Sequence, residues 1–380
     1  MKCAGLVLLV LICMLPTQAC AREDEMQAEI RGVVEGLDFS GIEGAALPDW
    51  FGYTDVREAV LGLASGETLS VDGVLSGVLG AFGEAVRVLG RTMIALMLPV
   101  LLVSVLLHTI GAQKGALAPL SRSMCFVLIL IPVMLLVFSE LAHTRETITA
   151  MTDRMDKLLP MLLTLLTALG GSASSAFLHP MVVAASGSMV FLAREVILRL
   201  VMCTCAVTAI NHLSDRAHLT RLAQLLRGAV CWLLGVSFTV FLGAMSLQGV
   251  CSASIDGVVI RAAKYAVDNF VPVVGGMFSD TMDTLVGCTL IVKNALGVAA
   301  VMVLLDAVLG PLARTLAAVF LMKLSAALLE PVADAQIVHA IGDFSRTIVL
   351  FLITMLCVGT MYFLLIVQLL LVGNLTVMLR

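Results

Sequence analysis

Lys293 and Asn294 are polar residues inside the apolar stretch 286–310, which makes them the first candidates for a functional role. An ion at the centre of a bilayer costs at least about 2.5 to 3.5 kcal/mol, so a lysine at that depth indicates a functional role or a contact with another helix. Lys293 could face a pore or another helix, and Asn294 favours a helix contact because a buried amide gains from a hydrogen bond across an interface. The alternative is that Lys293 extends to the outer membrane interface. We interpret Asp306 and Lys323, near predicted span ends, as ordinary interfacial residues.

A second candidate is the polar segment 251–285, which we predict to be an extracytoplasmic amphipathic helix followed by a turn. Its charges recur at helical spacing opposite an apolar face, as in helices that lie on a membrane surface. A connector between two spans needs only about 4 to 6 residues, so we expect a docking element, with a plain connector as the alternative. The candidate docking residues are Arg261, Lys264, Asp268, Asp280 and Asp283, and the predicted turn contains Pro272, Gly275 and Gly276.

Sequence motifs of enzymes do not occur in the chain. We find no G-x-x-x-x-G-K-[ST], H-E-x-x-H or G-x-S-x-G, so we expect no enzyme activity, no cofactor and a partner as the source of any energy. The six histidines are isolated, and Cys203 and Cys205 lie about 200° apart on a helix, so we expect no metal site. The net charge of −4 leaves no basic excess for nucleic acid.

The composition places these residues in a membrane protein. Of the 380 residues, 60% are hydrophobic and 13% are charged, and the mean hydropathy is +1.06. A helix needs about 20 residues to cross about 30 Å of hydrocarbon. Stretches that fit this length predict seven spans, at 92–110, 124–141, 195–213, 228–250, 286–310, 312–329 and 348–372.

The stretch 158–193 contains no Asp, Glu, Lys or Arg, yet it does not fit a single span. A continuous helix of this length would measure about 54 Å, too long for one crossing and marginal for two. The glycines and serines from Gly170 to Ser175, followed by His179 and Pro180, predict a break. We therefore expect a broken helical hairpin that is either re-entrant or a tight double pass.

The N-terminus and the distribution of charges predict on which side of the membrane each segment between spans lies. Residues 1–21 have the layout of a secretory signal peptide, and 22–91 form an acidic, mostly helical extracytoplasmic region that leans on the membrane part or on a partner. Basic residues concentrate in the segments that this orientation places inside. We predict cytoplasmic positions for 111–123, 214–227 and Arg380, and outer positions for 142–157, 251–285 and 330–347. The predicted transmembrane regions are thus 92–250 and 286–380.

Several runs of residues carry a family likeness. They are Ser246 to Gly249, Ala262 to Thr284, Val292 to Gly297, and Gly373 to Arg380. In these runs the chain resembles the stage III sporulation protein AE family. The likeness is most specific from 246 to 297 and in the last eight residues, whereas the acidic N-terminal region matches only in layout.

The resemblance implies a protein of the mother-cell membrane in an endospore-forming bacterium. It would be one part of a channel or secretion-like complex between mother cell and forespore, with other stage III sporulation membrane proteins and a separate ATPase subunit as partners. The family supplies no catalytic residues. We thus expect an all-α, polytopic transmembrane helical bundle in the lipid bilayer. The alternative function is a stand-alone permease for a small solute, with 158–193 and Lys293 lining its site.

Overall fold

The computed structural model describes residues 30–35, 51–66, 71–109, 118–169, 172–213, 219–270, 275–331 and 335–378. The predicted signal peptide, 1–21, lies outside these residues. Every regular element longer than one turn in the described part is helical, which confirms the all-α prediction. Hydrophobic sequence favours this outcome, because a helix satisfies all of its backbone hydrogen bonds within one segment.

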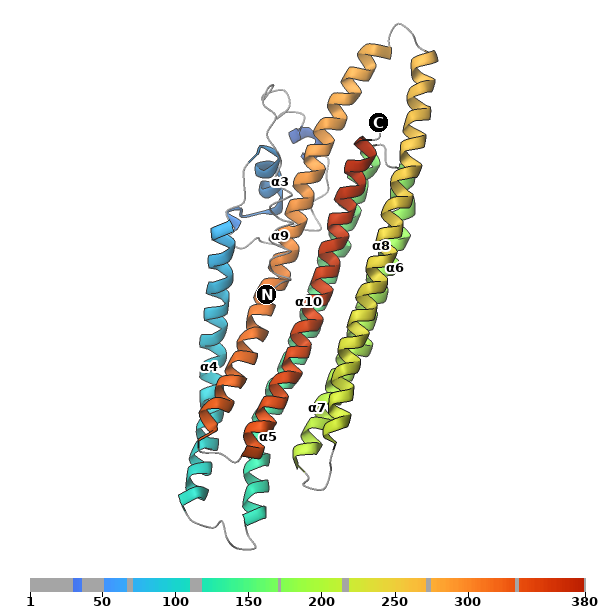
Figure 1. Cartoon of the computed structure of the whole chain (residues 1–380). Coiled ribbons are helices and arrows are strands. Elements are labelled where there is room, and N and C mark those ends of the chain that lie inside the picture. Colours follow the sequence, from blue (N-terminus) through green and yellow to red (C-terminus); the bar gives the residue numbers. More distant parts are fainter. Residues whose placement is uncertain are drawn as a thin grey trace.

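Six long helical segments run up and down the molecule, each antiparallel to the one before it (Figure 1). The third of them consists of α6, a π-helical turn η3, and α7 without interruption. The bounds are α4 (Val71–Thr109), α5 (Ala118–Ala168), α6 (Ser172–Phe191), η3 (Leu192–Ile197), α7 (Leu198–Leu213), α8 (Thr220–Phe270), α9 (Gly275–Leu329) and α10 (Ala335–Met378).

These helices are much longer than a bilayer is thick. At about 1.5 Å per residue, the longest one, α9, measures about 80 Å, against about 30 Å of hydrocarbon. Four stretches of the described residues are long and apolar enough to cross a membrane, and they are Asp72–Arg91, Thr220–Leu247, Val286–Leu329 and Ala335–Asn374. Parts of the helices must therefore extend beyond the bilayer.

The core forms where α9 and α10 pack against each other and against α5. Its buried side chains are mainly Val, Leu, Ile, Met and Ala, and they follow the inner faces of these three helices. The helix α8 packs on α10, α7 and α6, and α4 packs mainly on α9. This arrangement places α9 and α10 between the two outer sets of helices.

The short helix α3 (Val56–Ala64) belongs to the acidic N-terminal region and packs on α9. Asp55 caps it, since its Oδ1 accepts a hydrogen bond of 2.7 Å from the backbone N–H of Val56. The backbone N–H and the hydroxyl of Thr54 both donate to Glu58, which lowers the pKa of that carboxyl. Apolar α3 residues, including Ala59 and Val60, are fully buried. The N-terminal region therefore leans on a membrane-spanning helix.

Two predicted interruptions do not exist. The separate spans 286–310 and 312–329 form one helix, α9, with Pro311 inside it, and 142–157 lies within α5 rather than in an outer segment that separates two spans. Both predictions were wrong for physical reasons. A proline inside a helix removes one hydrogen bond, which packing on both sides offsets, and polar residues at helical spacing do not by themselves end a helix.

The segment 251–285 differs in a related way from the expected surface helix. No break separates it from the preceding span, because α8 continues to Phe270, and α9 begins at Gly275 and continues into the next span. In Figure 1 the ends of α8 and α9 project together at the top of the molecule as an arm. The prediction of a helix lying on the outer leaflet was wrong, and the pattern marks the projecting ends of two long helices.

Near the middle of 158–193, α5 ends at Ala168 and α6 begins at Ser172, on either side of Gly170 and Gly171. Pro180 is different, since it lies inside α6 and does not break it. The two limbs of this stretch continue the long helices on each side of it. Residues 195–213 therefore continue from the second limb instead of forming a separate span.

Because α9 is one helix where two spans were predicted, the segment 330–347 lies on the opposite side of the membrane from the predicted one. The side chain of Gln336 donates to the carbonyl oxygen of His212, and Asp343 contacts both His212 and Arg227, so the start of α10 lies beside the 214–227 segment. The prediction that 330–347 lies on the outer side, opposite 214–227, was wrong. α10 also runs away from this end, which places its C-terminal end opposite the side predicted for Arg380.

Reporter fusions test this arrangement. Fusions after Arg227 and after Glu330 should report the same compartment, the cytoplasm by the positive-inside rule, and a fusion after Gly276 should report the opposite one. Enzymatic activity of alkaline phosphatase and fluorescence of a cytoplasmic reporter measure this in intact cells. A fusion after Glu330 that reports the compartment of Gly276 would show that α9 is two spans.

Candidate functional site

Lys293 is a buried cation between α9 and α10, with 1% of its surface exposed. Its ammonium donates hydrogen bonds to the carbonyl oxygen of Leu370, at 2.7 Å, and to Oδ1 of Asn374, at 3.2 Å. No acid among the described residues forms an ion pair with it. In this geometry Lys293 is a contact between two helices, since both of its hydrogen-bond partners belong to α10. Asn294 beside it is partly buried.

Two glycines allow α9 and α10 to approach closely at this contact. A Cβ atom at Gly373 would overlap the side chain of Lys293, and one at Gly297 would overlap Leu370. Small residues commonly permit such close helix packing in membranes. The burial of Lys293 therefore depends on glycine at 373.

The other predicted site residues lie on the projecting arm. Arg261, Lys264 and Asp268 are on the last turns of α8, and Asp280 and Asp283 are on the first turns of α9. Their side chains are outside what the structure describes, as is Pro272. Gly275 and Gly276 are the first two residues of α9 rather than part of a turn. The structure thus separates the arm residues from Lys293, which lies lower on α9.

A buried acid on α5 was missed by the sequence analysis. Glu140 is fully buried, and its Oε2 accepts a hydrogen bond of 2.8 Å from the hydroxyl of Thr315 on α9. Its Oε1 lies 3.9 Å from Nε of Arg314, which is a loose ion pair. The ring of His143 hydrogen-bonds to the backbone of Pro311. A lone acid near the end of the stretch 124–141 was the available signal.

Three buried atoms of this group have no hydrogen-bond partner among the described residues. They are Oε1 of Glu140, Nε2 of His143 and Nε of Arg314. Buried polar groups are expensive without a partner, and ordered water commonly bridges groups of this kind. The α5–α9 contact therefore combines a buried acid, a half-buried imidazole and a partly exposed guanidinium in one polar cluster.

A second ion pair joins α5 and α9 further along. NH1 of Arg154 lies 2.6 Å from Oδ2 of Asp306, and it also donates to the carbonyl oxygen of Val303 at 2.8 Å. The hydroxyl of Tyr362 on α10 donates to Thr152 at 3.1 Å. Asp306 is therefore a helix contact inside the bundle, and its prediction as an ordinary interfacial residue was wrong.

Asp343 connects three helices at the opposite end of the bundle from the arm. Its carboxylate lies 3.0 Å from Nε2 of His212 on α7 and 3.2 Å from NH1 of Arg227 on α8. Arg346, one turn away on α10, contacts it at 3.0 Å. NH2 of Arg227 donates to the backbone carbonyl of Asp343 at 3.1 Å. These contacts hold α7, α8 and α10 together.

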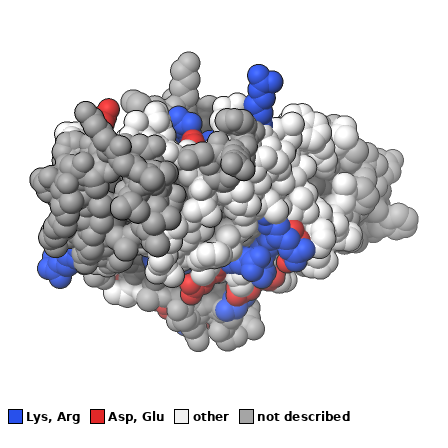
Figure 2. Space-filling model, turned by 90° about the horizontal axis from the view of Figure 1, so that it is seen from below, with Lys and Arg blue, Asp and Glu red and all other residues white. Residues whose placement is uncertain are grey.

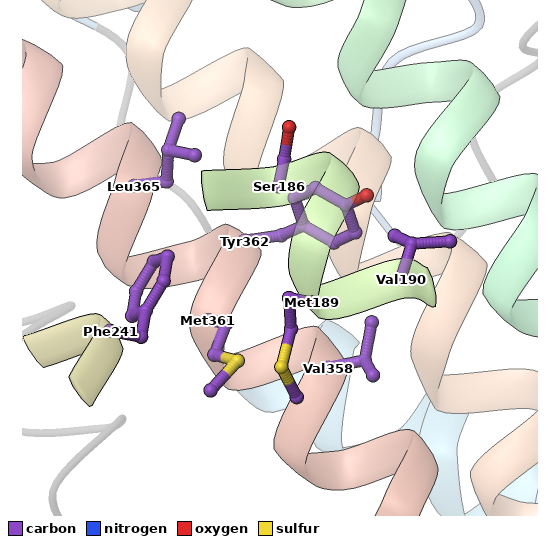
Figure 3. Close-up of a pocket in the computed structure, with 8 residues that line it drawn as sticks. All are labelled: Ser186, Met189, Val190, Phe241, Val358, Met361, Tyr362 and Leu365. Atoms are coloured by element: carbon purple, nitrogen blue, oxygen red, sulfur yellow. The ribbon is translucent and has the colours of Figure 1, made fainter. Parts of the chain in front are cut away.

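A small pocket lies between α6, α8 and α10 (Figure 3). Apolar side chains such as Met189, Phe241 and Leu365 surround it, and Ser186 and Tyr362 contribute hydroxyl groups. Its volume is about 10 Å³, which is room for about one water molecule. Within the described residues, no three His, Cys, Asp or Glu side chains gather as metal ligands.

Apolar helices long enough to cross a bilayer, joined by buried polar contacts, define a multi-pass membrane protein of the all-α class. The chain belongs to the stage III sporulation protein AE family, whose family model matches residues 54–373. A curated relative, stage III sporulation protein AE of Bacillus subtilis (strain 168), is 29% identical over 268 residues, which cover 70% of this chain and 67% of the relative. No solved structure matches the chain. The family resemblance is thereby confirmed.

Proposed function

We propose that the chain is an integral membrane subunit of a channel or secretion-like complex that connects mother cell and forespore. It acts from the mother-cell membrane and is needed for late forespore development. The observation that carries this proposal is the family match over residues 54–373, which includes almost all of the helical bundle. Its partners are other stage III sporulation membrane proteins.

The shape of the bundle supports an assembly subunit. The arm formed by the ends of α8 and α9 extends past the rest of the described molecule, where a partner can reach it (Figure 1). Asp280 and Asp283 lie at i and i+3 and so share one helix face on this arm. Because the sequence contains no nucleotide-binding motif, a separate ATPase subunit would supply energy.

A stand-alone permease is the second candidate, since the pocket is lined in part by the stretch 158–193 that we proposed for a solute site. A pocket of about 10 Å³ is too small for a solute such as an amino acid. The ammonium of Lys293 is also occupied by contacts with α10. These observations favour the assembly subunit.

Affinity purification from sporulating cells tests the proposal. The tagged chain should co-purify other sporulation membrane proteins and an ATPase. A double variant, Asp280→Asn with Asp283→Asn, removes two charges and little volume, so it should reach normal membrane abundance but recover less of these partners. Asp72→Asn with Glu84→Gln changes two exposed acids on α4 and serves as the matched control.

Two outcomes would contradict parts of this proposal. If the unmodified chain recovers no sporulation membrane protein and carries a solute alone in proteoliposomes, the permease is correct. If the arm variant and the control recover the same partners, the two acids have no docking role.

A further inference from the structure

The outward face of α5 carries a charged stripe. Its exposed residues recur at helical spacing along the helix, so they share one face. The charged members of this stripe are Arg145, Glu146, Asp153, Asp156 and Lys157. Arg154, the one neighbouring charge that turns inward, is paired with Asp306. No ion pair with another helix engages the five stripe residues in the described part of the chain.

Two more charges lie on the neighbouring helical segment. Glu195 in η3 and Arg199 in α7 form an ion pair at the surface, and α5 packs on α6 and α7. Seen from below, a mixed group of acidic and basic side chains lies along one edge of the molecule, and a few separate charged side chains lie at the other edges (Figure 2). We call the five α5 residues together with Glu195 and Arg199 the charged face.

The charged face lies at the same height as an apolar surface on α8. Residues 228–255 of α8 contain no charge, and Trp232, Val240 and Leu247 are exposed there. This stretch is only slightly longer than a bilayer requires, so any placement of about 20 residues within it includes Val240. Val240 is therefore at membrane depth.

Two contacts with α10 relate the heights of α5 and α8. Tyr362 bonds to Thr152 of α5, and Gln368 bonds to the backbone of Met245 on α8. Asp153 follows Thr152 directly, so it lies near the height of Tyr362. On α10, Gln368 comes six residues after Tyr362, and on α8, Met245 comes five residues after Val240. Since α8 and α10 run in the same direction, Asp153 and Val240 lie at nearly equal heights.

Charged side chains at membrane depth almost always face protein or water, because lipid strongly disfavours them. We propose that the charged face lines a water-filled space in the assembled complex, while the apolar surface of α8 faces lipid. This inference rests on the function proposed above. The face carries three basic and four acidic residues, so the space has little preference for the sign of a solute's charge. This composition suits a wide hydrated passage rather than an ion-selective filter.

Paired cysteine substitutions at matched height test the inference. Asp153→Cys and Val240→Cys are introduced separately in a chain in which Cys203→Ala and Cys231→Ala remove the two exposed native thiols of the described residues. Membranes from sporulating cells are treated with a charged thiol reagent that does not cross bilayers, and mass spectrometry measures labelling at each position. We expect labelling at 153 to be faster than at 240 by about tenfold or more, because a thiol in lipid does not ionise.

Denaturation in dodecyl sulfate is the control, and both cysteines should then react. In the unmodified chain, native Cys203 should also react, since it lies one turn from Arg199 and is exposed. Equal rates at 153 and 240, faster labelling at 240, or no reaction at Cys203 would overturn the inference. If such a chain still co-purifies its partners, only the water-filled space is wrong and the proposed complex stands.

Discussion

Replacing Lys293 with methionine should raise the melting temperature of the purified protein and reduce spore formation. The two side chains have similar length and shape, so the core between α9 and α10 stays filled. The substitution removes a buried charge that has two hydrogen bonds but no ion pair among the described residues. Replacing a buried ion pair by well-packed apolar groups is often neutral or stabilising by about 1 to 4 kcal/mol, and a buried charge without an ion pair has less attraction to lose. A residue that weakens the fold in this way is by default a functional one.

Lys323→Met is the matched control for Lys293→Met, because Lys323 is exposed on the same helix. It should change neither the melting temperature nor the spore count by much. Thermal unfolding in detergent and heat-resistant colony counts measure the two effects. A lower melting temperature for Lys293→Met would show that Lys293 stabilises the α9–α10 contact, and normal sporulation would remove Lys293 from the functional residues.

Helix type and the main membrane-spanning stretches follow from the sequence, because they depend on local composition. The apolar stretches 228–250 and 348–372 lie within α8 and α10. Helix length could not be predicted in the same way. The rule of about 20 residues per span describes the bilayer, and it does not limit a helix that continues into water or into a partner. For this reason 251–285 was assigned to a segment between spans when it extends α8 and α9, whereas 142–157 was assigned there because its charges were expected only outside the bilayer.

Pro311 shows a second limit of local patterns. Proline commonly ends a helix, so the sequence placed two spans on either side of it. In the structure, α5 packs beside α9 at this position, and the ring of His143 hydrogen-bonds to the Pro311 backbone. That contact comes from a residue far away in the sequence, so no local pattern reveals it. The error in this one helix reversed the predicted side of 330–347.

The sequence predicted a site residue only where a single charged residue lies in an otherwise apolar stretch. Lys293 stands out as a cation in an apolar run, and the structure shows it buried. Glu140 and Arg154 meet their partners on α9, and Asp343 meets partners on α7 and α8. Such pairs depend on how the helices pack, which one sequence without relatives does not specify. The charged face could not be predicted either, because only the packing of the helices shows that its residues are exposed and that Arg154 is turned inward.

Asp343→Ala should be among the most destabilising substitutions of a polar residue in the bundle, at about 3 to 5 kcal/mol. The carboxylate contacts His212 and Arg227, whose side chains are 10% and 16% exposed. Without it, the guanidinium of Arg227 stays buried with no other ion pair in the described structure, and its Nε already has no hydrogen-bond partner there. Asp343→Asn keeps the volume and one acceptor, so its effect should be smaller.

Arg346→Ala separates this mechanism from a general loss of charge at the same end. Arg346 contacts the same carboxylate, but its side chain is 70% exposed, so the loss should be below about 1 kcal/mol. In thermal unfolding in detergent, the melting temperature of Asp343→Ala should therefore be far lower than those of Arg346→Ala and the unmodified protein. Equal melting temperatures for the two variants would show that Asp343 does not hold α7, α8 and α10 together. In that case apolar packing alone joins these helices, and the position of 330–347 beside 214–227 would depend on the reporter fusions.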